Sequence, residues 1–402
     1  MTMLVIGAGM AGHRAVISLR ASGYDGAITM LGEEALLPYD RPPLSKSSIT
    51  EVAPPTPVWL LDEGIAASLK VEVKLNQQAL YIDRSAKTVA TAQGTYTYAK
   101  LLLATGAKPR QLNCPGCEHA LLLRNFDDTL VLRERFQPGK NIVIIGGGFI
   151  GLELASSASK RGCNVTLIEA LPRILMRGVP EAVAKIVHDR HIAAGVNIRV
   201  NTAVKSLQKD SVTLGDDSII PCDTSIAGIG AAPDTKLASG AGLTIDNGIA
   251  CNEVLQTSDP DIYAAGDCCS FIHSAFANRR LRFEAWRNAQ DQGNVAAENM
   301  LGANKPFKAI PWFWSDQYDL SLQITGMADM GPVTVVRKPS TDALILFHLA
   351  DNGTLCGASG IGPGNSIARD IKLAEMMIAK GLSPAASQLE DAAIQLKTLL
   401  KG

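Results

Sequence analysis

Two glycine-rich segments are the residues best suited to chemistry in this chain. The first is Gly7-Ala8-Gly9-Met10-Ala11-Gly12, and the second is Gly146-Gly147-Gly148-Phe149-Ile150-Gly151. At this spacing the first glycine makes a tight turn, the second lets the backbone approach a pyrophosphate, and the third lets a helix pack closely on a strand. The phosphates then lie at the positive end of the helix. Two such motifs predict a bound flavin in one site, a nicotinamide in the other, and a protein that moves electrons.

The elements that must position these turns surround them in the sequence. Apolar runs at residues 3–6 and 142–145 precede the motifs and are typical of buried parallel strands, and a helical pattern follows each motif. The next strand pattern in each set ends in a carboxylate, at Glu33 and at Glu169, and Glu34 is a possible substitute for its neighbour. A carboxylate about 20 residues past the motif can accept hydrogen bonds from an adenosine ribose.

Glu169 also bears on the choice of nicotinamide. A carboxylate there repels a ribose 2′-phosphate, so the sequence favours NADH over NADPH, although Arg173 and Arg177 lie close along the chain. The alternative interpretation is that Glu169 simply ends a strand in solvent.

Strand and helix patterns alternate along the first two thirds of the chain and predict an α/β fold. We expect two Rossmann-like dinucleotide-binding domains, one for FAD and one for NAD, and a C-terminal α+β domain. The FAD domain would be split over residues 1–107 and 232–304. Residues 108–231 would form the NADH domain, and residues 305–402 the third domain.

Composition narrows the class of partner. The chain has 402 residues, 8 cysteines and a formal net charge of −1 at pH 7. This near-neutral balance argues against a nucleic acid or an anionic membrane as partner, and no apolar stretch reaches the ~18 residues of a membrane span. The chain starts without a basic leader and its cysteines are scattered through apolar segments, so we expect a cytoplasmic protein with reduced thiols.

Further segments make a resemblance specific. They are Arg41-Pro42-Pro43-Leu44-Ser45-Lys46, Ala-Thr-Gly at 104–106, Thr-Ser-Asp-Pro at 257–260, Ala-Gly-Asp at 265–267, and Pro311-Trp312-Phe313-Trp314-Ser315-Asp316-Gln317-Tyr318. Over nearly its whole length the chain resembles the FAD-dependent NADH:ferredoxin reductases of bacterial oxygenase systems. The resemblance implies a glutathione-reductase-like fold and hydride transfer from NADH to FAD. Single electrons would then pass to a two-iron (2Fe-2S) ferredoxin that feeds a mono- or dioxygenase.

The resemblance also implies roles for individual residues. Lys46 and Glu153 would face each other across the hydride-transfer site, and Trp314 would lie near the flavin ring; these three are the expected catalytic residues. The residues expected to bind FAD are Gly7, Gly9, Ala11, Gly12, Glu33, Glu34, Arg41, Lys46, Ala79, Ala104, Thr105, Gly106, Arg124, Gly266, Asp267, Glu284, Ala285 and Trp286. Those expected to bind NADH are Gly146, Gly148, Phe149, Ile150, Gly151, Glu153, Glu169, Arg177, Gly228 and Gly230.

Blander interpretations of these residues remain open. Lys46 and Glu153 could form a surface ion pair of little energetic value, and Trp314 could be a core residue or a cover for the flavin. Two other functions also remain open. One is an NADH-dependent reductase of a small acceptor such as monodehydroascorbate or a quinone. The other is a flavoprotein whose redox state controls binding to a partner.

Cysteines and histidines help to separate related functions. Relatives on this fold that reduce disulfides or peroxide carry cysteines just after position 41, and this chain has none between Arg41 and Ser48. Its Cys114-Pro115-Gly116-Cys117 falls where the family has a linker loop, so we do not expect a catalytic dithiol. His188 and His191 lack partners at ligand spacing; we expect both at the surface and no metal site.

A basic cluster flanks the predicted flavin-contacting segment. It consists of Arg279, Arg280, Arg282 and Arg287. Because two-iron ferredoxins are acidic, such a rim would steer docking and raise the association rate. The alternative is an ordinary solvated face.

Overall fold

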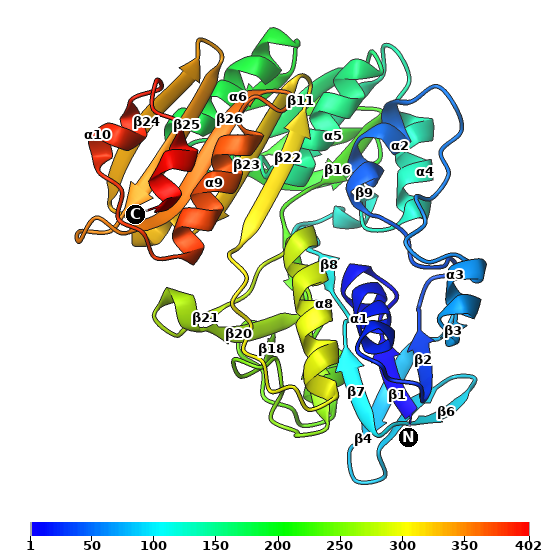
Figure 1. Cartoon of the computed structure of the whole chain (residues 1–402). Coiled ribbons are helices and arrows are strands. Elements are labelled where there is room, and N and C mark those ends of the chain that lie inside the picture. Colours follow the sequence, from blue (N-terminus) through cyan, green and yellow to red (C-terminus); the bar gives the residue numbers. More distant parts are fainter. Residues whose placement is uncertain (1, 402) are drawn as a thin grey trace. The chain divides into compact units, whose positions relative to one another are not determined.

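The computed structural model describes residues 2–401, which form two compact units. One unit comprises residues 2–40, Pro57–Lys108 and Ala232–Ala309, and the other comprises Arg41–Thr56, Pro109–Ala231 and residues 310–401. The chain therefore passes from one unit to the other five times, a path that the colours of Figure 1 follow. The predicted boundaries of three domains stay a prediction.

A five-stranded parallel sheet organises the first unit. Its strand order is β19-β7-β1-β2-β3, formed by β1 (Thr2–Ile6), β2 (Ala27–Leu31), β3 (Val71–Lys74), β7 (Lys100–Leu103) and β19 (Ile262–Ala264). The central strand is a continuous apolar run in which Leu4 and Val5 are both fully buried. A parallel sheet covered on both faces requires such a run, because neighbouring side chains point to opposite faces.

Two long helices of the first unit, α1 (Met10–Ala21) and α8 (Trp286–Met300), pack side by side (Figure 1). Their close approach depends on Gly293, where a Cβ would lie 2.4 Å from the carbonyl oxygen of Ala11. The other elements of this unit are α3 (Glu63–Ser68), α7 (Lys236–Gly240), the sheet of β4 (Ala79–Asp83), β5 (Thr88–Thr91) and β6 (Gly94–Thr97), and the sheet of β18 (Ile249–Ala250), β20 (Cys269–His273) and β21 (Arg279–Leu281).

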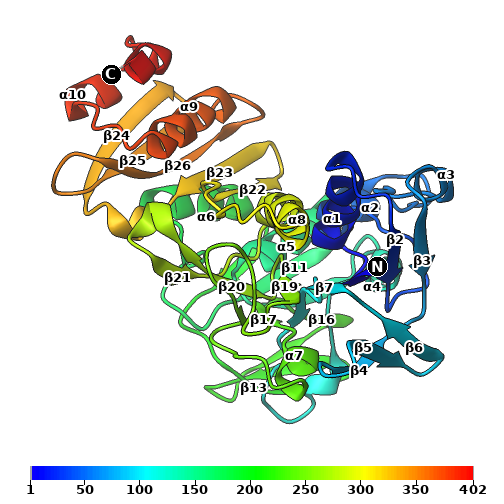
Figure 2. The ribbon, with the colours of Figure 1, turned by 60° about the horizontal axis from the view of Figure 1, so that its bottom comes forward.

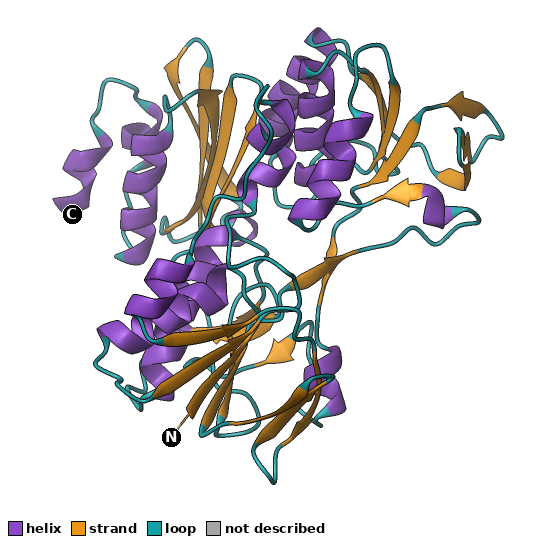
Figure 3. Cartoon of the chain, turned by 90° about the vertical axis from the view of Figure 1, so that its right-hand side faces the viewer, coloured by secondary structure: helices purple, strands orange, loops and turns teal. Residues whose placement is uncertain are grey.

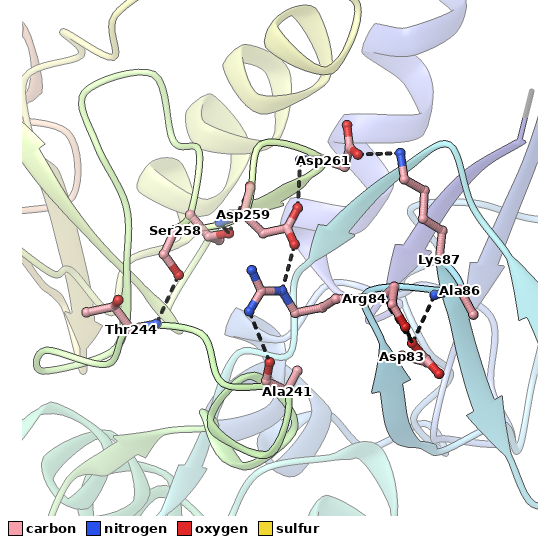
Figure 4. A network of polar contacts seen from close by, with 11 residues as sticks. Asp83, Arg84, Ala86, Lys87, Ala241, Thr244, Ser258, Asp259 and Asp261 are labelled. Carbon is pink, nitrogen blue, oxygen red and sulfur yellow. Dashed lines mark hydrogen bonds and ion pairs between the residues drawn. The ribbon is translucent and has the colours of Figure 1, made fainter.

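An ionic network fastens the loop before β19 to its neighbours (Figure 4). The Arg84 Nε lies 2.6 Å from Asp259 Oδ2, and Asp259 Oδ1 accepts a bond from the backbone N–H of Asp261. The Asp261 carboxylate in turn pairs with Lys87 and, at 2.7 Å, with Lys100 of β7. These contacts hold the edge strand β19 against β7, and so position the turn that follows β19.

The second unit contains an equivalent parallel sheet. Its order is β12-β11-β10-β16-β9, formed by β9 (Ala120–Leu121), β10 (Asn141–Ile145), β11 (Asn164–Ile168), β12 (Asn197–Arg199) and β16 (Thr224–Ala227). In β10 the side chains alternate between two cores, as strand geometry requires. Ile142 and Ile144 join the core of the helices, and Val143 and Ile145 join the core of a small antiparallel sheet.

Helices α4 (Phe126–Arg135), α5 (Phe149–Lys160) and α6 (Glu181–Ala193) supply the first of these cores. The small sheet of the other core consists of β13 (Val204–Gln208), β14 (Ser211–Leu214) and β15 (Ile219–Pro221). A short helix, α2 (Ser47–Thr50), packs on α4. Strands β8 (Ala107–Pro109) and β17 (Ala231–Pro233) lie where the chain changes units.

The C-terminal part of the second unit is an antiparallel sheet with strand order β22-β23-β26-β25-β24. Its strands are β22 (Trp312–Gln317), β23 (Leu320–Gly326), β24 (Val333–Ser340), β25 (Ala343–Leu349) and β26 (Leu355–Pro363). Leu322, Leu346 and Ile361 share one core with α5 and α6, so these helices lie between two sheets (Figure 3). Helix α9 (Ala368–Ala379) packs on the sheet's other face, where a Cβ on Gly360 would touch Ile367 and Ile371 (Figure 2). Helix α10 (Ala386–Glu390) follows near the end of the chain.

These sheets confirm the predicted fold class of two Rossmann-like domains and a C-terminal α+β domain. Within residues 2–401, no helix has both the length and the apolar character needed to cross a bilayer.

Buried histidines predict that the stability of the fold is sensitive to acid. Burial is the main cause that lowers the pKa of His13, His191 and His348 from 6.5 to about 4. Between these values the unfolded chain binds protons that the folded chain does not, so the free energy of unfolding should fall as the pH drops from 6.5 towards 4. Each histidine contributes on the order of 3 kcal/mol to this fall.

Denaturant titrations across that pH range measure the slope. The variant His348→Gln should flatten it by at most about a third, because it removes one of the three imidazoles whose pKa falls to about 4, while the buried His273, whose pKa burial also lowers, stays. Added salt should change the slope little, since desolvation rather than an ion pair is the main cause. A slope that is the same in the folded variant and the wild type would contradict this account.

Candidate functional site

The first glycine turn joins β1 to α1 and leaves no room for a side chain at two positions. Gly7 has a φ of +112°, and a Cβ there would lie 2.1 Å from the carbonyl oxygen of Ala104. A Cβ on Gly12 would lie 2.0 Å from the carbonyl oxygen of Gly7. Around Gly9 the space is open, and no described side chain caps the N-terminus of α1. The turn therefore presents backbone N–H groups at a helix N-terminus, which suits a pyrophosphate.

Gln292 of α8 adds a buried polar group to the same unit. Its Oε1 accepts a hydrogen bond of 2.8 Å from the backbone N–H of Gly266, which itself packs against Ala11. The side chain is fully buried, and its Nε2 has no partner within residues 2–401. A buried donor left unpaired costs about 1–3 kcal/mol, so a ligand rich in oxygen atoms would satisfy it.

Two features make the first unit suitable for FAD. The open space at Gly9 leaves room for a pyrophosphate, and the unpaired Nε2 of Gln292 can donate to an oxygen of the ligand. Sequence analysis did not single out Gln292, because one polar residue in a helical pattern carries no signal of burial.

The predicted ribose carboxylates of the first unit differ in their surroundings. Glu34 is half-buried and accepts a hydrogen bond of 2.5 Å from the hydroxyl of Tyr39. Glu33 is exposed and accepts a bond of 2.9 Å from Gln78. Either carboxylate keeps lone pairs for a ribose, since each oxygen can accept more than one bond.

Other predicted FAD residues of this unit lie at turns and at the start of α8. Trp286 begins α8, and its Nε1 donates to Asp40 Oδ1 at 2.5 Å. Ala285 is the N-cap and Glu284 precedes it, and no described side chain caps this helix, so its positive end can face a ligand. Ala79 begins β4, Ala104 to Gly106 follow β7, and Asp267 follows β19 by three residues.

The second glycine turn repeats the geometry of the first between β10 and α5. Gly146 also has a φ of +112°, and its Cβ would lie 2.4 Å from the carbonyl oxygen of Gly228. A Cβ on Gly151 would lie 2.0 Å from the carbonyl oxygen of Gly146. At Gly148 the nearest atom is 3.9 Å away, so the backbone is again open where a pyrophosphate would approach. NADH therefore fits the second unit on the same test.

Backbone N–H groups hold Glu169 at the end of β11. Its two carboxylate oxygens accept bonds from the N–H groups of Gly147 (2.7 Å) and Leu171 (2.8 Å). Arg173 is turned inward, and its guanidinium donates to the carbonyl oxygens of Ile174, Leu175 and Val179. Arg177 and the predicted NADH residues Ile150 and Gly230 are exposed.

Lys46 and Glu153 meet in the second unit. The Lys46 Nζ lies 2.7 Å from Glu153 Oε2, and the Glu153 side chain is only 4% exposed against 23% for Lys46. Arg133 of α4 holds the loop that carries Lys46, because it donates to carbonyl oxygens of residues 48, 49, 52 and 53. The pair therefore joins a buried carboxylate to a half-buried lysine on a supported loop, which argues against an exposed surface ion pair.

Trp314 and the other predicted cofactor residues of the second unit contact neighbouring side chains or backbone. The rings of Trp312 and Trp314 stack with centroids 5.2 Å apart, and both are half-buried on β22. Phe149, predicted to contact NADH, packs on Phe313 with ring centroids 4.3 Å apart. Arg41 donates to the carbonyl oxygen of Arg124 at 2.6 Å. The roles of these residues stay predictions.

The basic cluster is largely engaged in its own unit. Arg280 donates to the carbonyl oxygens of Cys251 and Ser270 and lies 3.1 Å from Asp246. Arg282 pairs with Glu284 at 2.7 Å, and Arg287 lies 3.7 Å from Asp291. Arg279 is exposed, whereas the other three are half-buried.

Two remaining sequence features have different outcomes. His188 is half-buried, with a side chain 37% exposed, but the expectation that His191 lies at the surface is wrong, because it is fully buried under β22. Cys114 and Cys117 are free thiols on a turn whose Gly116 has a φ of +77° and packs against Leu207. Burial raises the pKa of the Cys114 thiol, which favours the unreactive form.

The two open glycines predict separable losses. Gly9→Ala and Gly148→Ala place a methyl group in open space, so both variants should keep the wild-type melting temperature as apoproteins. Gly9→Ala should lose the yellow flavin, whereas Gly148→Ala should keep it and raise the KM for NADH at least tenfold. Flavin absorbance and steady-state kinetics measure both. Loss of flavin in Gly148→Ala, with Gly9→Ala unaffected, would reverse the assignment of the two sites.

Comparison with known proteins bears on both glycine turns. The family model described as Pyridine nucleotide-disulphide oxidoreductase matches residues 1–293, and the model described as Reductase C-terminal matches residues 312–400. The chain is 36% identical to the anthranilate 1,2-dioxygenase system ferredoxin–NAD(+) reductase component of Burkholderia cepacia, over 99% of this chain and 98% of that protein. It is 37% identical to the rubredoxin–NAD(+) reductase of Pseudomonas putida, over 81% of this chain and 86% of that protein.

A solved structure agrees with these matches. The fold is similar to that in the covalent putidaredoxin reductase–putidaredoxin complex, with a TM-score of 0.92 and 32% identity over 100% of this chain and 98% of that chain. The predicted resemblance is thereby confirmed. The chain belongs to the pyridine nucleotide-disulphide oxidoreductase family, among its FAD-dependent NADH:ferredoxin reductases.

Proposed function

We propose that this protein takes a hydride from NADH through a bound FAD and delivers electrons singly to a 2Fe-2S ferredoxin of a bacterial oxygenase system. The observation that carries the proposal is the match of 99% of the chain to a ferredoxin–NAD(+) reductase component, combined with two glycine turns open at the phosphate position. FAD, when bound, supplies the exchange between two-electron and one-electron chemistry. The protein supplies binding, orientation and charge.

Glu169 supports a preference for NADH. Its carboxylate is fixed by two backbone N–H groups and so presents a negative charge where a 2′-phosphate would lie. Arg173, the neighbour that could offset this charge, is already held by three carbonyl oxygens. Arg177 is an exposed cation of this loop, but it follows Glu169 by eight residues.

Lys46 and Glu153 would balance charge at the site of hydride transfer. Their pairing leaves the site neutral before NADH arrives, and Lys46, the more exposed partner, can shift its bond towards negative charge that develops beside it. The open N-terminus of α8 in the first unit would favour negative charge in the same way.

A rubredoxin is the second candidate acceptor. A rubredoxin–NAD(+) reductase is 37% identical, but that match covers 81% of this chain, whereas the match to the ferredoxin–NAD(+) reductase component covers 99%. The longer match therefore favours a ferredoxin. We place the protein in the cytoplasm because its described cysteines are free thiols, which a reducing compartment maintains.

Reduction of cytochrome c by NADH tests the acceptor directly. The purified yellow protein should give a slow rate alone and a much faster rate when a two-iron oxygenase ferredoxin is added. The same assay with a rubredoxin is the comparison. A rate that no iron–sulfur protein or rubredoxin increases would favour a quinone or another small acceptor, and would overturn the proposal.

Arg279 is the exposed member of the arginine cluster, and docking is tested there. Because Arg280 and Arg282 support their own unit, reversing them would confuse docking with stability. Arg279→Glu should slow ferredoxin reduction about tenfold at low ionic strength and less at high salt. Reduction of ferricyanide by NADH should be unchanged.

Lys209→Glu, the same charge change at an exposed position in the β13–β14 turn, is the matched control. An equal loss with ferricyanide, or an equal effect of Lys209→Glu, would contradict docking at Arg279.

A further inference from the structure

Glu153 is a buried carboxylate that receives bonds from two segments of the second unit. Lys46 and Ser45, both on the loop after Arg41, reach Oε2 at 2.7 and 2.5 Å. Ser315 of β22 donates to Oε1 at 2.6 Å. A charge removed from water needs such donors, because an unpaired buried carboxylate is strongly disfavoured. Each oxygen of Glu153 therefore has a separate set of partners.

A chain of hydrogen bonds continues beyond Ser315. Gln317 Nε2 lies 3.1 Å from Ser315 Oγ, and Gln317 Oε1 lies 2.8 Å from His191 Nε2. The hydroxyl of Tyr318 lies 3.2 Å from His191 Nδ1. Ser315, Gln317 and His191 are all buried, so no solvent competes for these bonds.

The carboxylate sets the direction of every bond in this chain. An ionised carboxylate can only accept hydrogen bonds, so the hydroxyl of Ser315 donates its one hydrogen to Glu153. The Ser315 oxygen must then accept from the amide nitrogen of Gln317. The amide oxygen of Gln317 then faces His191, which must carry its proton on Nε2. His191 Nδ1 is left bare and accepts from the Tyr318 hydroxyl. Four donors thus point in series towards one charge.

The alternation of β22 explains why these groups coincide. Strand geometry places Phe313, Ser315 and Gln317 on one face and Trp312 and Trp314 on the other. The first face runs along α5, where Phe149, Glu153 and Ser156 follow at helical spacing. Phe149 contacts Phe313, Glu153 contacts Ser315, and Ser156 Oγ accepts from the backbone N–H of the residue after Gln317.

Tyr318, at the far end of this series of hydrogen bonds, has a strained but supported backbone conformation. Its φ of +56° is uncommon for a residue with a bulky side chain. Its backbone N–H is held by Ser156, its hydroxyl by His191, and its ring by the guanidinium of Arg190 at 4.4 Å. Strain of this kind persists only where the surroundings enforce it.

We propose that Ser315, Gln317 and His191 are positioning residues that fix Oε1 of Glu153, and so leave Oε2 turned to Lys46 for the hydride-transfer step. The inference rests on the proposed function only in that last clause. The donor chain ends on Glu153 Oε1. It also links β22, the strand that carries Trp314, to the carboxylate of α5 by side-chain bonds rather than by apolar packing alone.

Nitrogen-15 NMR of protein labelled at histidine tests the direction of the chain without any turnover. The resonances of His191 are assigned by their loss in His191→Gln. The expected spectrum shows a neutral ring with the proton on Nε2 and a bare Nδ1. A proton on Nδ1 would mean that the chain runs the other way and would overturn the proposal.

Reduction kinetics test the consequence for catalysis. In Ser315→Ala the limiting rate of flavin reduction by NADH should fall about tenfold, while the NADH concentration at half-saturation and the flavin content stay unchanged. Ser315→Thr, which keeps a hydroxyl, should recover most of the rate. Gln317→Met should produce a smaller fall in the same direction, because Ser315 then lacks its donor.

Ser321→Ala is the matched control. Ser321 of β23 is a buried serine bonded to Gln323 two residues on, as Ser315 is to Gln317, but its cross-strand partner Asp316 places it on the opposite face of the sheet. Its limiting rate should equal the wild-type rate. An equal fall in Ser315→Ala and Ser321→Ala, or no fall in Ser315→Ala, would overturn the proposal.

These outcomes are distinguishable from failure of the proposed function. If no ferredoxin or rubredoxin accelerates cytochrome c reduction in the wild type, the proposed acceptor is wrong. The histidine spectrum and the rate of flavin reduction by NADH do not depend on that acceptor, so they decide the role of Ser315 separately.

Discussion

A negative charge buried away from water is costly, and the second unit is built around one at Glu153. Its two oxygens are satisfied by a loop that precedes the parallel sheet in the sequence and by a strand that follows much later. No one of these segments could keep the carboxylate ionised in an apolar core. The loop Arg41–Thr56, although it lies inside the predicted first domain, accordingly packs with the second unit.

The same constraint explains why a C-terminal sheet belongs to this unit. Apolar side chains of the sheet share a core with α5 and α6, which sets the distance between them. Polar side chains of β22 then fix the orientation, because Ser315 and Gln317 can bond to Glu153 and His191 in one register only. A shift of one residue would turn both away and put Trp314 in their place. Apolar packing and polar pairing therefore both require the same register of β22 against α5.

Much of this molecule could be predicted from local sequence. The two glycine turns are recognisable because a strand, a helix and the close approach of Gly12 to Gly7 or of Gly151 to Gly146 all lie within a few residues, although distant strand ends also crowd Gly7 and Gly146. The alternation of strands and helices likewise predicted the fold class. The contact of Lys46 with Glu153 was predicted only through resemblance to a family, because spacing along the chain does not place a loop residue beside a helix.

Other features depend on contacts that sequence patterns do not contain. His191 lies on a helix with mixed polar and apolar residues, so its burial follows from the strand that covers it rather than from its neighbours. Gln292 is hidden for the same reason, because its partner Gly266 comes from a different turn. The arginine cluster shows the converse: four nearby charges suggested a docking rim, yet carbonyl oxygens and acids of the same unit engage Arg280, Arg282 and Arg287, and sequence patterns do not show such contacts.

The position of β19 in the sheet has a consequence for synthesis on the ribosome. Strands β1, β2, β3 and β7 are complete once residue 103 has been made, but their edge partner begins only at residue 262. Until then the nascent chain carries an unpaired edge at β7, which can pair wrongly with other chains. The parallel sheet of the second unit, contained in residues 120–227, is translated in full during this interval. The sheet of the first unit is therefore completed through a long-range pairing, which is intrinsically slow and leaves its edge open to aggregation in the meantime.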